Sequence, residues 1–252
     1  TANPKCKTTH FLPENLMSHL SEAVGMSSSL SARSVFYSID YRKLNGLTKK
    51  NSYPLPRIDE TLDSLGGNEW FCTLDLQSGY WQIGMHPDDM EKTAFSSHLG
   101  LYQYNRMPFG LCNAPATFEA MMETLLSDLL WKKCLVYLDD VIVFGKTFEE
   151  CLGNLEEVVK RIMANGLKLK PSKCNFFKKS IVYLGRIIST DGIKADPSKI
   201  ESVVKWSKPT NAKEVRSFLG FCSYYRDFIP RYSRISHPMQ MIAHWTPGYR
   251  CQ

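Results

Sequence analysis

The chain lacks paired cysteines and long apolar runs. Its eight cysteines stand singly, with no Cys-x-x-Cys pair in the 252 residues. That spacing argues against a structural zinc site and favours an intracellular, reduced protein. No apolar run approaches the roughly 18 residues that a membrane helix needs. We therefore expect no membrane partner, and the sequence shows no signal-peptide pattern.

Acidic residues are missing from one long stretch of the chain. Between Val158 and Thr190 there are eight Lys or Arg residues and no Asp or Glu, although the formal net charge of the whole chain is only +6. Such a block is usually a solvated face. It also suits a polyanion, because nucleic-acid affinity rests on phosphate neutralisation. Composition leaves both interpretations open.

Apolar residues are abundant, at 43% with 12% aromatics, which supports packed cores in one large domain or two modest ones. Their spacing predicts strands and helices that interleave without regular βαβ alternation, so we expect an α+β fold with an antiparallel sheet. The predicted strands cover 70–75, 80–85, 95–107 as a hairpin around Leu99-Gly100, 134–144, 176–177 and 181–188. The predicted helices cover 13–26, 57–65, 114–129, 148–165, 197–206 and 212–228, with Asn113, Thr147 and Asn211 as N-caps.

The most informative stretch is 134–144, where two short apolar runs flank Asp139 and Asp140. The runs predict buried strands, and the two acids predict the tight turn of a β-hairpin. A turn selected for stability would carry Asn-Gly or Asp-Gly, because the favoured two-residue turns need positive φ. Adjacent like charges therefore indicate a divalent cation such as magnesium, which one or two carboxylates and substrate phosphates hold together. A solvated surface turn is the alternative.

A third carboxylate, Asp75, ends the strand predicted over 70–75. If that strand pairs with the hairpin, Asp75 and Asp139 face each other and bracket two metal ions about 4 Å apart. One ion would activate a 3′-hydroxyl, and both would stabilise in-line displacement at a phosphate. Adjacent side chains on a strand point to opposite faces, so Asp140 would contribute less directly.

A series of ordered motifs runs through most of the chain. They are Asp40-Tyr-Arg-Lys-Leu-Asn45, Tyr53-Pro-Leu-Pro-Arg57, Leu74-Asp-Leu-Gln-Ser-Gly-Tyr-Trp-Gln82, Lys92-Thr-Ala-Phe95, Met107-Pro-Phe-Gly-Leu-Cys-Asn-Ala-Pro-Ala-Thr-Phe118, Tyr137-Leu-Asp-Asp140, Lys168-Leu-Lys-Pro-Ser-Lys-Cys174, Tyr183-Leu-Gly185, Ser217-Phe-Leu-Gly220 and Tyr224-Tyr-Arg-Asp-Phe-Ile-Pro230. Over about residues 40 to 235 the chain thus resembles the reverse transcriptase of gypsy-type LTR retrotransposons. Ordered motifs at this spacing are far more specific than a lone Tyr-x-Asp-Asp.

The resemblance implies a right-hand polymerase: an antiparallel palm with partial fingers over 37–190, and a helical thumb with the start of the connection over 191–252. It implies an RNA-directed DNA polymerase of a retrotransposon polyprotein. Such an enzyme extends a DNA primer on an RNA or DNA template, using deoxynucleoside triphosphates and two Mg²⁺ ions, with Mn²⁺ as a substitute. It also implies a cytoplasmic particle or the nucleus as its location.

The resemblance assigns catalytic roles to four residues. Asp75, Asp139 and Asp140 correspond to the metal-binding carboxylates of the family. Lys173 corresponds to the lysine near the pyrophosphate leaving group, where a cation or proton donor helps. From the residues alone, Lys173 could equally be one more solvated lysine.

The remaining assignments concern substrates. Tyr80 corresponds to the aromatic that blocks a ribose 2′-hydroxyl, although an aromatic there is more often core. Phe109 and Gly110 correspond to the loop beneath the incoming nucleotide and template base, or form an ordinary turn. Tyr183, Leu184 and Gly185 correspond to the hairpin that grips the primer end. Arg216, Gly220 and Tyr224 correspond to the face of the thumb helix that tracks the duplex minor groove. Buried packing explains Tyr224 equally well.

The match fails over residues 1–36, which we expect to be truncated or replaced. Relatives carry a lysine-rich fingers hairpin and an arginine four residues before the position of Asp40, and these contact the incoming triphosphate. Here that position is Phe36, with only Arg33 nearby. Two alternatives follow. One is a catalytically defective, nucleic-acid-binding remnant, which the unmatched fingers favour. The other is an RNA-copying RNA polymerase, which Tyr80 disfavours because it should exclude ribonucleotides.

Overall fold

The chain divides into two compact units between Lys179 and Ser180. The computed structural model describes residues 39–54 and 56–244, so the helix predicted at 13–26 and the interpretation of Phe36 lie outside the described residues. The boundary between palm and thumb implied by the sequence resemblance is at 190/191. The division falls earlier because the strands after Ser180 pair with one another in a sheet of their own.

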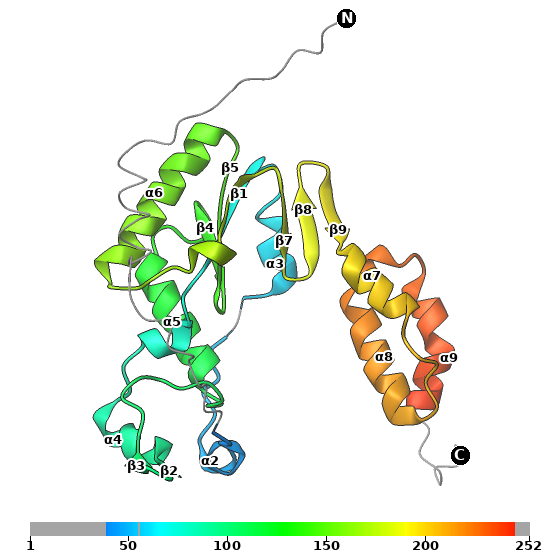
Figure 1. Ribbon diagram of the computed structural model, residues 1–252. Helices are drawn as coiled ribbons and strands as arrows, with labels where there is room; N and C mark the ends of the chain where they lie inside the picture. The colour runs from blue at the N-terminus through cyan, green and yellow to red at the C-terminus, as the bar shows by residue number, and fades with distance from the viewer. Residues whose placement is uncertain (1–38, 55, 245–252) are drawn as a thin grey trace, which may run out of the picture. The chain divides into compact units, whose positions relative to one another are not determined.

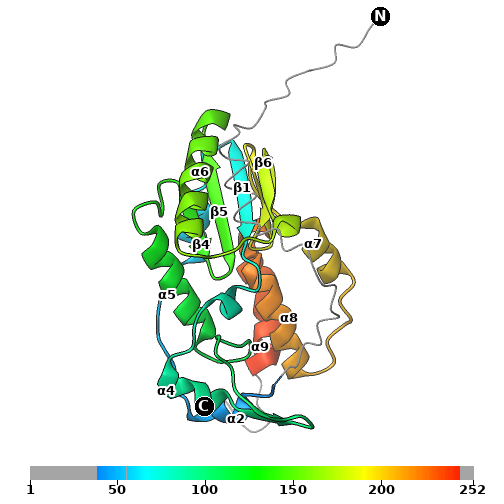
Figure 2. The same cartoon turned by 60° about the vertical axis from the view of Figure 1, so that its left-hand side comes forward.

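The first unit is built on a four-stranded antiparallel sheet, as predicted. Its strands are β1 (Trp70–Asp75), β4 (Cys134–Tyr137), β5 (Asp140–Gly145) and β6 (Asn175–Lys178), in the order β4-β5-β1-β6 (Figure 2). The long central pairing of β1 with β5 runs from Trp70↔Gly145 to Asp75↔Asp140. Since side chains alternate along a strand, every second residue of these strands points into the same core.

Two helices, α5 (Ala114–Leu126) and α6 (Phe148–Ala164), pack on this sheet (Figure 1). Burial of each large apolar side chain contributes about 1.5–3 kcal/mol, so this helix–sheet core carries much of the unit's stability. The core includes Cys72, Leu74, Val141 and Val143 from the sheet, Phe118, Met122 and Leu126 from α5, and Leu155, Val159 and Ile162 from α6.

Local signals predicted both helix starts, at Ala114 and Phe148, but only one of the two capping hydrogen bonds. The Thr147 hydroxyl accepts the N–H of Glu150 at 3.1 Å, so α6 begins at its predicted cap. Asn113 makes no cap bond to α5. Its side chain instead accepts the Asn51 N–H at 2.9 Å and donates to the Lys49 carbonyl at 3.0 Å. Asn113 is at the N-cap position as predicted, but the expected side-chain capping bond was wrong because a distant loop binds the same amide.

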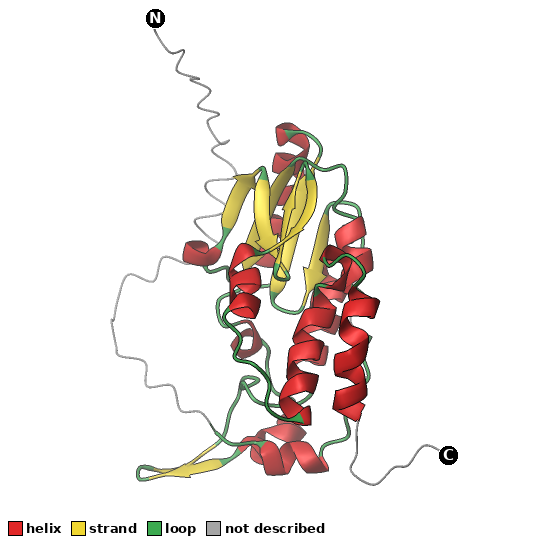
Figure 3. Cartoon of the chain, turned by 90° about the vertical axis from the view of Figure 1, so that its right-hand side faces the viewer, coloured by secondary structure: helices red, strands yellow, loops and turns green. Residues whose placement is uncertain are grey.

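Short elements complete the first unit: α2 (Arg42–Leu47), α3 (Ile58–Asp63), η1 (Gly79–Gln82), α4 (Pro87–Met90), η2 (Glu91–Thr93), β2 (Phe95–Ser97), β3 (Gly100–Tyr102) and η3 (Pro171–Lys173). The predicted hairpin at 95–107 is confirmed as β2–β3, which projects from its neighbouring helices (Figure 3). The extended segment predicted from Tyr80 was wrong. Ser78 adopts φ 52 there and turns the chain into the single turn η1.

The second unit holds the sheet β7 (Ser180–Tyr183), β8 (Arg186–Ser189) and β9 (Gly192–Ala195), followed by α7 (Pro197–Val204), α8 (Ala212–Tyr224), η4 (Arg226–Phe228) and α9 (Tyr232–His244). The capping box predicted at Asn211 is confirmed: its side-chain oxygen accepts the Glu214 N–H at 2.9 Å, and its amide donates to the Glu214 carboxylate at 2.8 Å. Helix α9, which contains Pro238 in its interior, was not predicted.

Candidate active site

The site is centred on the hairpin between β4 and β5. Tyr137 pairs with Asp140, so the two turn residues are Leu138 and Asp139, not Asp139 and Asp140 as the sequence suggested. Leu138 has φ 55. A left-handed conformation costs a residue with a Cβ roughly 1–2 kcal/mol, so this turn is not optimised for stability. Its N–H donates to Glu119 Oε2 at 2.5 Å.

The register of β1 and β5 brings the three predicted carboxylates together. Asp75 lies directly opposite Asp140 in the ladder, and Asp139 lies one residue before, in the turn. The expectation that Asp139 would be the residue opposite Asp75 was wrong by one position. Burial raises the pKa of Asp139, and the charges of Asp140 and Asp75 raise it further. The pKa of Asp140 is raised by desolvation and then by Asp75.

The carboxylate cluster suits a divalent cation. Asp139 Oδ1 is buried and has no hydrogen-bond partner among the described residues. A buried charged oxygen is costly unless it is paired, and a cation would pair it. Within residues 39–54 and 56–244, no three His, Cys, Asp or Glu side chains alone form a metal-holding group.

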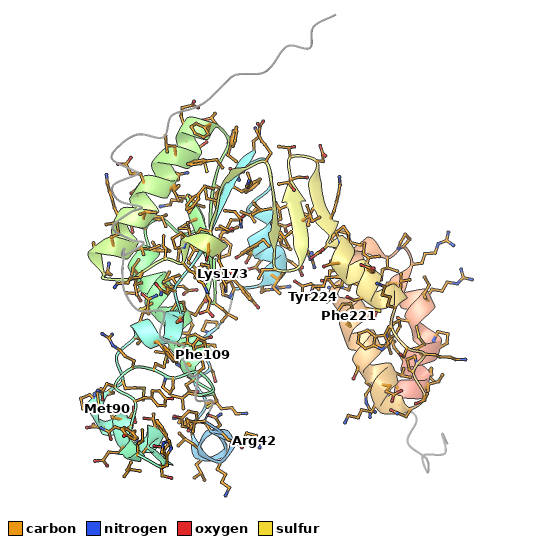
Figure 4. The ribbon with its side chains drawn as sticks, viewed as in Figure 1. Arg42, Met90, Phe109, Lys173, Phe221 and Tyr224 are labelled. Carbon is orange, nitrogen blue, oxygen red and sulfur yellow. The ribbon has the colours of Figure 1, made fainter. Side chains whose placement is uncertain are left out.

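Lys173 lies at the same end of the sheet (Figure 4), on η3 just before β6. Its Nζ is 3.1 Å from Asp75 Oδ2, and its side chain remains 57% exposed. The charge of Lys173 lowers the pKa of both Asp139 and Asp140, partly offsetting the effects that raise them. The lysine is therefore part of the carboxylate cluster and not an isolated surface charge.

Tyr80 lies beside the turn, on η1. Its ring packs against Phe118 at 5.5 Å and Phe109 at 5.0 Å between centroids. Burial raises the pKa of Tyr80, with smaller contributions from Asp139 and Glu119. The side chain is half-buried, so it contributes to packing and also borders the site.

Gly79, which sequence reasoning did not single out, sets the spacing between η1 and the turn. A Cβ at this position would meet the Phe118 ring at 2.8 Å and Asp139 Oδ1 at 3.3 Å. Only a residue without a side chain allows this approach. The signal available was the Ser-Gly pair directly after a predicted strand, which is typical of close backbone approach.

Phe109 and Gly110 lie on the loop that leads into α5 (Figure 4). Phe109 is 48% exposed, and Gly110 has φ 93. Asn45, which was also missed, donates to the Gly110 carbonyl at 2.8 Å and accepts the Cys112 N–H at 2.9 Å. A side chain 65 residues away in sequence thus fixes this loop, and a local turn preference does not explain its shape.

In the second unit, Leu184 and Gly185 form the two-residue turn of the β7–β8 hairpin, with φ 47 and 70. Positive φ at both central residues matches the twist of a tight hairpin. The Tyr224 hydroxyl donates to the Leu184 carbonyl, and the Tyr225 hydroxyl donates to the Gly185 carbonyl at 3.3 Å. Tyr183 itself is buried, at 3% exposure.

The three residues predicted on one face of α8 have different surroundings. Arg216 and Gly220 line a cleft of about 590 Å³ together with residues of α9. Arg216 also donates to the Ala243 carbonyl at 2.8 Å, near the end of α9. Tyr224 holds the β7–β8 turn and packs on Tyr225, at the hairpin end of the helix (Figure 4).

Residues 28–188 match the family model described as "Reverse transcriptase (RNA-dependent DNA polymerase)". The chain belongs to the reverse transcriptase family. The match begins at residue 28 and so includes part of the 1–36 segment. Reverse transcriptases are RNA-directed DNA polymerases that use divalent metal ions, in agreement with the carboxylate cluster.

Similar proteins confirm the resemblance to gypsy-type elements. The reverse transcriptase chain is 48% identical over 201 residues to the Retrovirus-related Pol polyprotein from transposon 297 of Drosophila melanogaster, covering 80% of this chain and 19% of that one. It is 41% identical over 204 residues to the corresponding polyprotein from transposon gypsy of the same organism, covering 81% and 20%. The chain thus spans about one fifth of these relatives.

Solved structures confirm the right-hand fold of the reverse transcriptase, with its antiparallel palm, partial fingers and helical thumb. The foamy viral protease-reverse transcriptase in complex with an RNA/DNA hybrid has a TM-score of 0.71 and 26% identity, over 82% of this chain and 29% of that one. The same enzyme in a dsDNA complex has a TM-score of 0.76 and 26% identity, over 84% and 37%.

The Lys and Arg residues between Val158 and Thr190 do not form one surface of unpaired positive charges. Several of these charges are compensated, and the block continues across the division at Lys179 into the second unit. Lys160 pairs with Glu156, Arg161 with Asp128, Lys173 with Asp75 and Lys179 with Glu69, whereas Lys168, Lys170 and Lys178 are exposed without an ion pair in the described part of the chain. No described helix is long and apolar enough to cross a membrane.

Proposed function

We propose that this chain performs RNA-directed DNA synthesis, transferring a nucleotide from a deoxynucleoside triphosphate to a primer 3′-end. The observation that carries the proposal is the meeting of Asp75, Asp139 and Asp140 at one end of the β1–β5 ladder, where a buried Asp139 oxygen lacks a hydrogen-bond partner among residues 39–54 and 56–244. Repulsion between carboxylates placed this close is offset when they bind a divalent cation together. The foamy viral relatives were solved with an RNA/DNA hybrid and with dsDNA, which supports template–primer as the partner.

Asp75, Asp139 and Asp140 would hold the metal ions, with Mg²⁺ as our choice because the ligands are hard oxygens. When bound, two such ions activate the attacking hydroxyl and stabilise the charge that develops on the phosphate. Lys173, at 3.1 Å from Asp75, supplies a fixed positive charge beside the carboxylates. We assign it to the pyrophosphate leaving group, where it can donate a proton.

Tyr80, Phe109 and Gly110 would form the nucleotide site. The Tyr80 ring is held in place by Phe109 and Phe118, so it cannot yield to an extra hydroxyl without disturbing both contacts. Discrimination by a clash of this kind rejects the ribose. Tyr80→Ala should raise the ratio of ribonucleotide to deoxyribonucleotide incorporation. If the ratio stays constant in a folded variant, Tyr80 serves packing alone.

In the second unit, the tip at Leu184–Gly185 would contact the primer end, and the cleft beside Arg216 and Gly220 would follow the duplex. Tyr183 is buried and Tyr224 binds the hairpin, so we assign these two residues to the shape of the tip. A fixed tip matters because effective reaction needs the attacking hydroxyl placed within a fraction of an ångström.

The test is primer extension on an RNA template with Mg²⁺. Asp75→Asn and Asp139→Asn should abolish extension, because each removes a metal ligand, while unfolding curves show a folded protein. Asp128→Asn is the matched control, since Asp128 pairs with Arg161 at 3.0 Å outside the cluster. Undiminished extension by either site variant contradicts the proposal.

One observation favours the rival function of a binding remnant without catalysis. Phe36 stands where the resemblance places a triphosphate-binding arginine. A remnant would bind template–primer normally and yet fail to extend it at any nucleotide concentration or with Mn²⁺. Extension that recovers at high nucleotide concentration supports the polymerase.

A further inference from the structure

A fully buried carboxyl group lies beneath the turn that carries Asp139. Glu119 is on α5, and its exposed fraction is 0%. Its Oε2 accepts the Leu138 N–H at 2.5 Å, while its Oε1 is buried without a hydrogen-bond partner among the described residues. Glutamate is rarely fully buried unless it is paired, so a purely apolar core role does not explain this residue.

The turn depends on an acceptor at this place. Leu138 has φ 55, which a leucine adopts only when its surroundings hold it there. The hydrogen bond from Leu138 N–H to Glu119 is the contact that the structure shows at that backbone group. Without it, the turn would contain a strained residue and an unsatisfied N–H next to Asp139.

The position of Asp139 follows from this turn. On one side, Asp139 Oδ1 approaches so close to Gly79 that a Cβ there would lie 3.3 Å away. On the other, the preceding residue is fixed from α5 by Glu119, next to Phe118, whose ring also borders Gly79. A shift of the Leu138 peptide would therefore displace the Asp139 side chain from its position against Gly79.

We propose that Glu119 is a positioning residue of the polymerase site: by accepting the Leu138 N–H it fixes the turn that presents Asp139 to a metal ion. The inference rests on the proposed function. A group that orients a metal ligand typically changes metal affinity or activity by about 10- to 100-fold when it is lost. Burial raises the pKa of Glu119 to about 7, so a neutral amide should replace it well.

Three substitutions separate positioning from packing. Glu119→Gln keeps an acceptor oxygen of the same reach, Glu119→Met fills similar space without one, and Glu119→Asp withdraws the carboxyl by one methylene. Glu123→Gln is the matched control, because Glu123 is on the same helix but accepts from the Tyr53 hydroxyl. All four are tested in the full chain, with the wild type as reference.

The first readout does not depend on activity. Hydrogen exchange at the Leu138 amide should be slow in the wild type, Glu119→Gln and Glu123→Gln, and fast in Glu119→Met and Glu119→Asp. The amides of Val141 and Val143, in the strand that follows, should keep their protection in every variant. Binding of Mn²⁺ alone, followed by electron paramagnetic resonance, should weaken about 10-fold in Glu119→Met and Glu119→Asp.

The second readout is steady-state primer extension. Glu119→Met and Glu119→Asp should lower kcat by about 10- to 100-fold with little change in the KM for template–primer, and Glu119→Gln should restore most of the loss. Should Glu119→Met fail to fold, Glu119→Asp decides the question. The inference is overturned if Glu119→Asp shows slow Leu138 exchange, unchanged Mn²⁺ binding or unchanged kcat. It is also overturned if Glu119→Gln lowers kcat as much as Glu119→Asp does. If the wild type does not extend a primer at all, the proposed function fails, while the exchange and Mn²⁺ arms still decide whether Glu119 positions the turn.

Discussion

Three neighbouring residues in this structure are individually unfavourable for folding. Leu138 has a positive φ, Asp139 has a buried oxygen without a hydrogen-bond partner in the described part of the chain, and Glu119 is a fully buried acid. Natural sequences usually avoid such local conflicts except at functional sites, where other contacts offset the cost. The meeting of these three features at one turn is stronger evidence for a functional site than any one of them alone.

Gly79 provides a test of this confinement. Gly79→Ala would place a Cβ 2.8 Å from the Phe118 ring and 3.3 Å from Asp139 Oδ1. We expect it to reduce primer extension by at least about 10-fold, because misplacing a reacting group by about 1 Å costs roughly 100-fold. The free energy of unfolding, measured in parallel with denaturant, should fall by a smaller fraction of its wild-type value than primer extension does.

Gly153→Ala is the matched control, since no atom of the described residues lies within 4 Å of a Cβ at that position of α6. It should stabilise the protein by about 0.5–1 kcal/mol, because glycine is unfavourable within a helix. Equal activity in the two variants would show that the approach of Gly79 to Asp139 does not matter.

The stability of the metal-free protein should depend on pH through Glu119. Burial raises its pKa from the ordinary 4.5 to about 7 in the folded chain. The folded state therefore binds more protons than the unfolded state between these values. The contribution is fully present below about pH 4.5 and is lost as the pH rises through about 7.

The loss is about 3 kcal/mol, since a pKa difference of one corresponds to about 1.36 kcal/mol. Glu119→Gln should flatten this part of the curve of unfolding free energy against pH, measured in a chelator. Asp139 and Asp140 also have raised pKa values and should leave a residual slope. The same slope in wild type and Glu119→Gln would mean that Glu119 does not titrate in this range.

At the scale of elements, sequence reasoning succeeded where the signal was local. The caps at Thr147 and Asn211 were predicted because an N-cap and its partner lie within three residues of each other. It failed where a distant segment decides the outcome. Asn113 binds the loop at Asn51 instead of its own helix, and Ser78 turns the chain so that Tyr80 reaches Phe118.

Helix α9 shows the same limit. An interior proline costs a helix about 3 kcal/mol or more, so the local sequence around Pro238 does not favour a helix. Packing on α8 offsets that cost: the Tyr232 hydroxyl donates to the Leu219 carbonyl at 3.2 Å, and Ala243 is buried against Val215 and Leu219. None of these contacts can be read from the α9 sequence alone.

The β7–β8 hairpin and α8 should act as one element. Tyr224→Phe removes the hydroxyl that binds the Leu184 carbonyl but keeps the ring, which lies 5.3 Å from the Arg186 guanidinium. We expect a stability loss of about 1 kcal/mol, together with weaker template–primer binding by fluorescence anisotropy and an unchanged nucleotide KM.

Ser202→Ala, on α7 of the same unit, is the control, since its hydroxyl donates to the Ser198 carbonyl at 2.8 Å and does not line the cleft beside Arg216. A Tyr224→Phe variant that loses stability but binds template–primer normally would limit this tyrosine to packing.

At the scale of the whole molecule, the site combines segments that are far apart in the sequence. The carboxylates could be predicted because β1 and the hairpin are recognisable strands, and antiparallel pairing places their ends together. The exact register, which puts Asp140 and not Asp139 opposite Asp75, could not. A shift of one residue is decided by core packing along the entire ladder.

The segment before Asp40 bears on the proposed binding of the triphosphate. If the arginine that the resemblance places at position 36 contacts the triphosphate, Phe36 removes a charge-assisted contact worth about 1.5–3 kcal/mol. That corresponds to roughly a 10- to 150-fold higher nucleotide KM, with duplex binding near normal. Phe36→Arg should lower the KM in steady-state extension assays.

Arg33 supplies the control. If Arg33 substitutes for the missing arginine through a local shift of register, Arg33→Ala should raise the nucleotide KM and Phe36→Arg should have little effect. If neither substitution changes the nucleotide KM, the triphosphate is not bound from this segment.

Strand β6 ends at Lys178 and β7 begins at Ser180, so a single residue joins the sheets of the two units. That residue is itself anchored: Lys179 Nζ is 2.7 Å from Glu69 Oε2 and 4.1 Å from the centroid of the Trp70 ring. A trans peptide leaves only two soft torsions per residue. The covalent link between the two sheets therefore contains only a few freely rotating bonds, and its one residue is bound to side chains of the first unit.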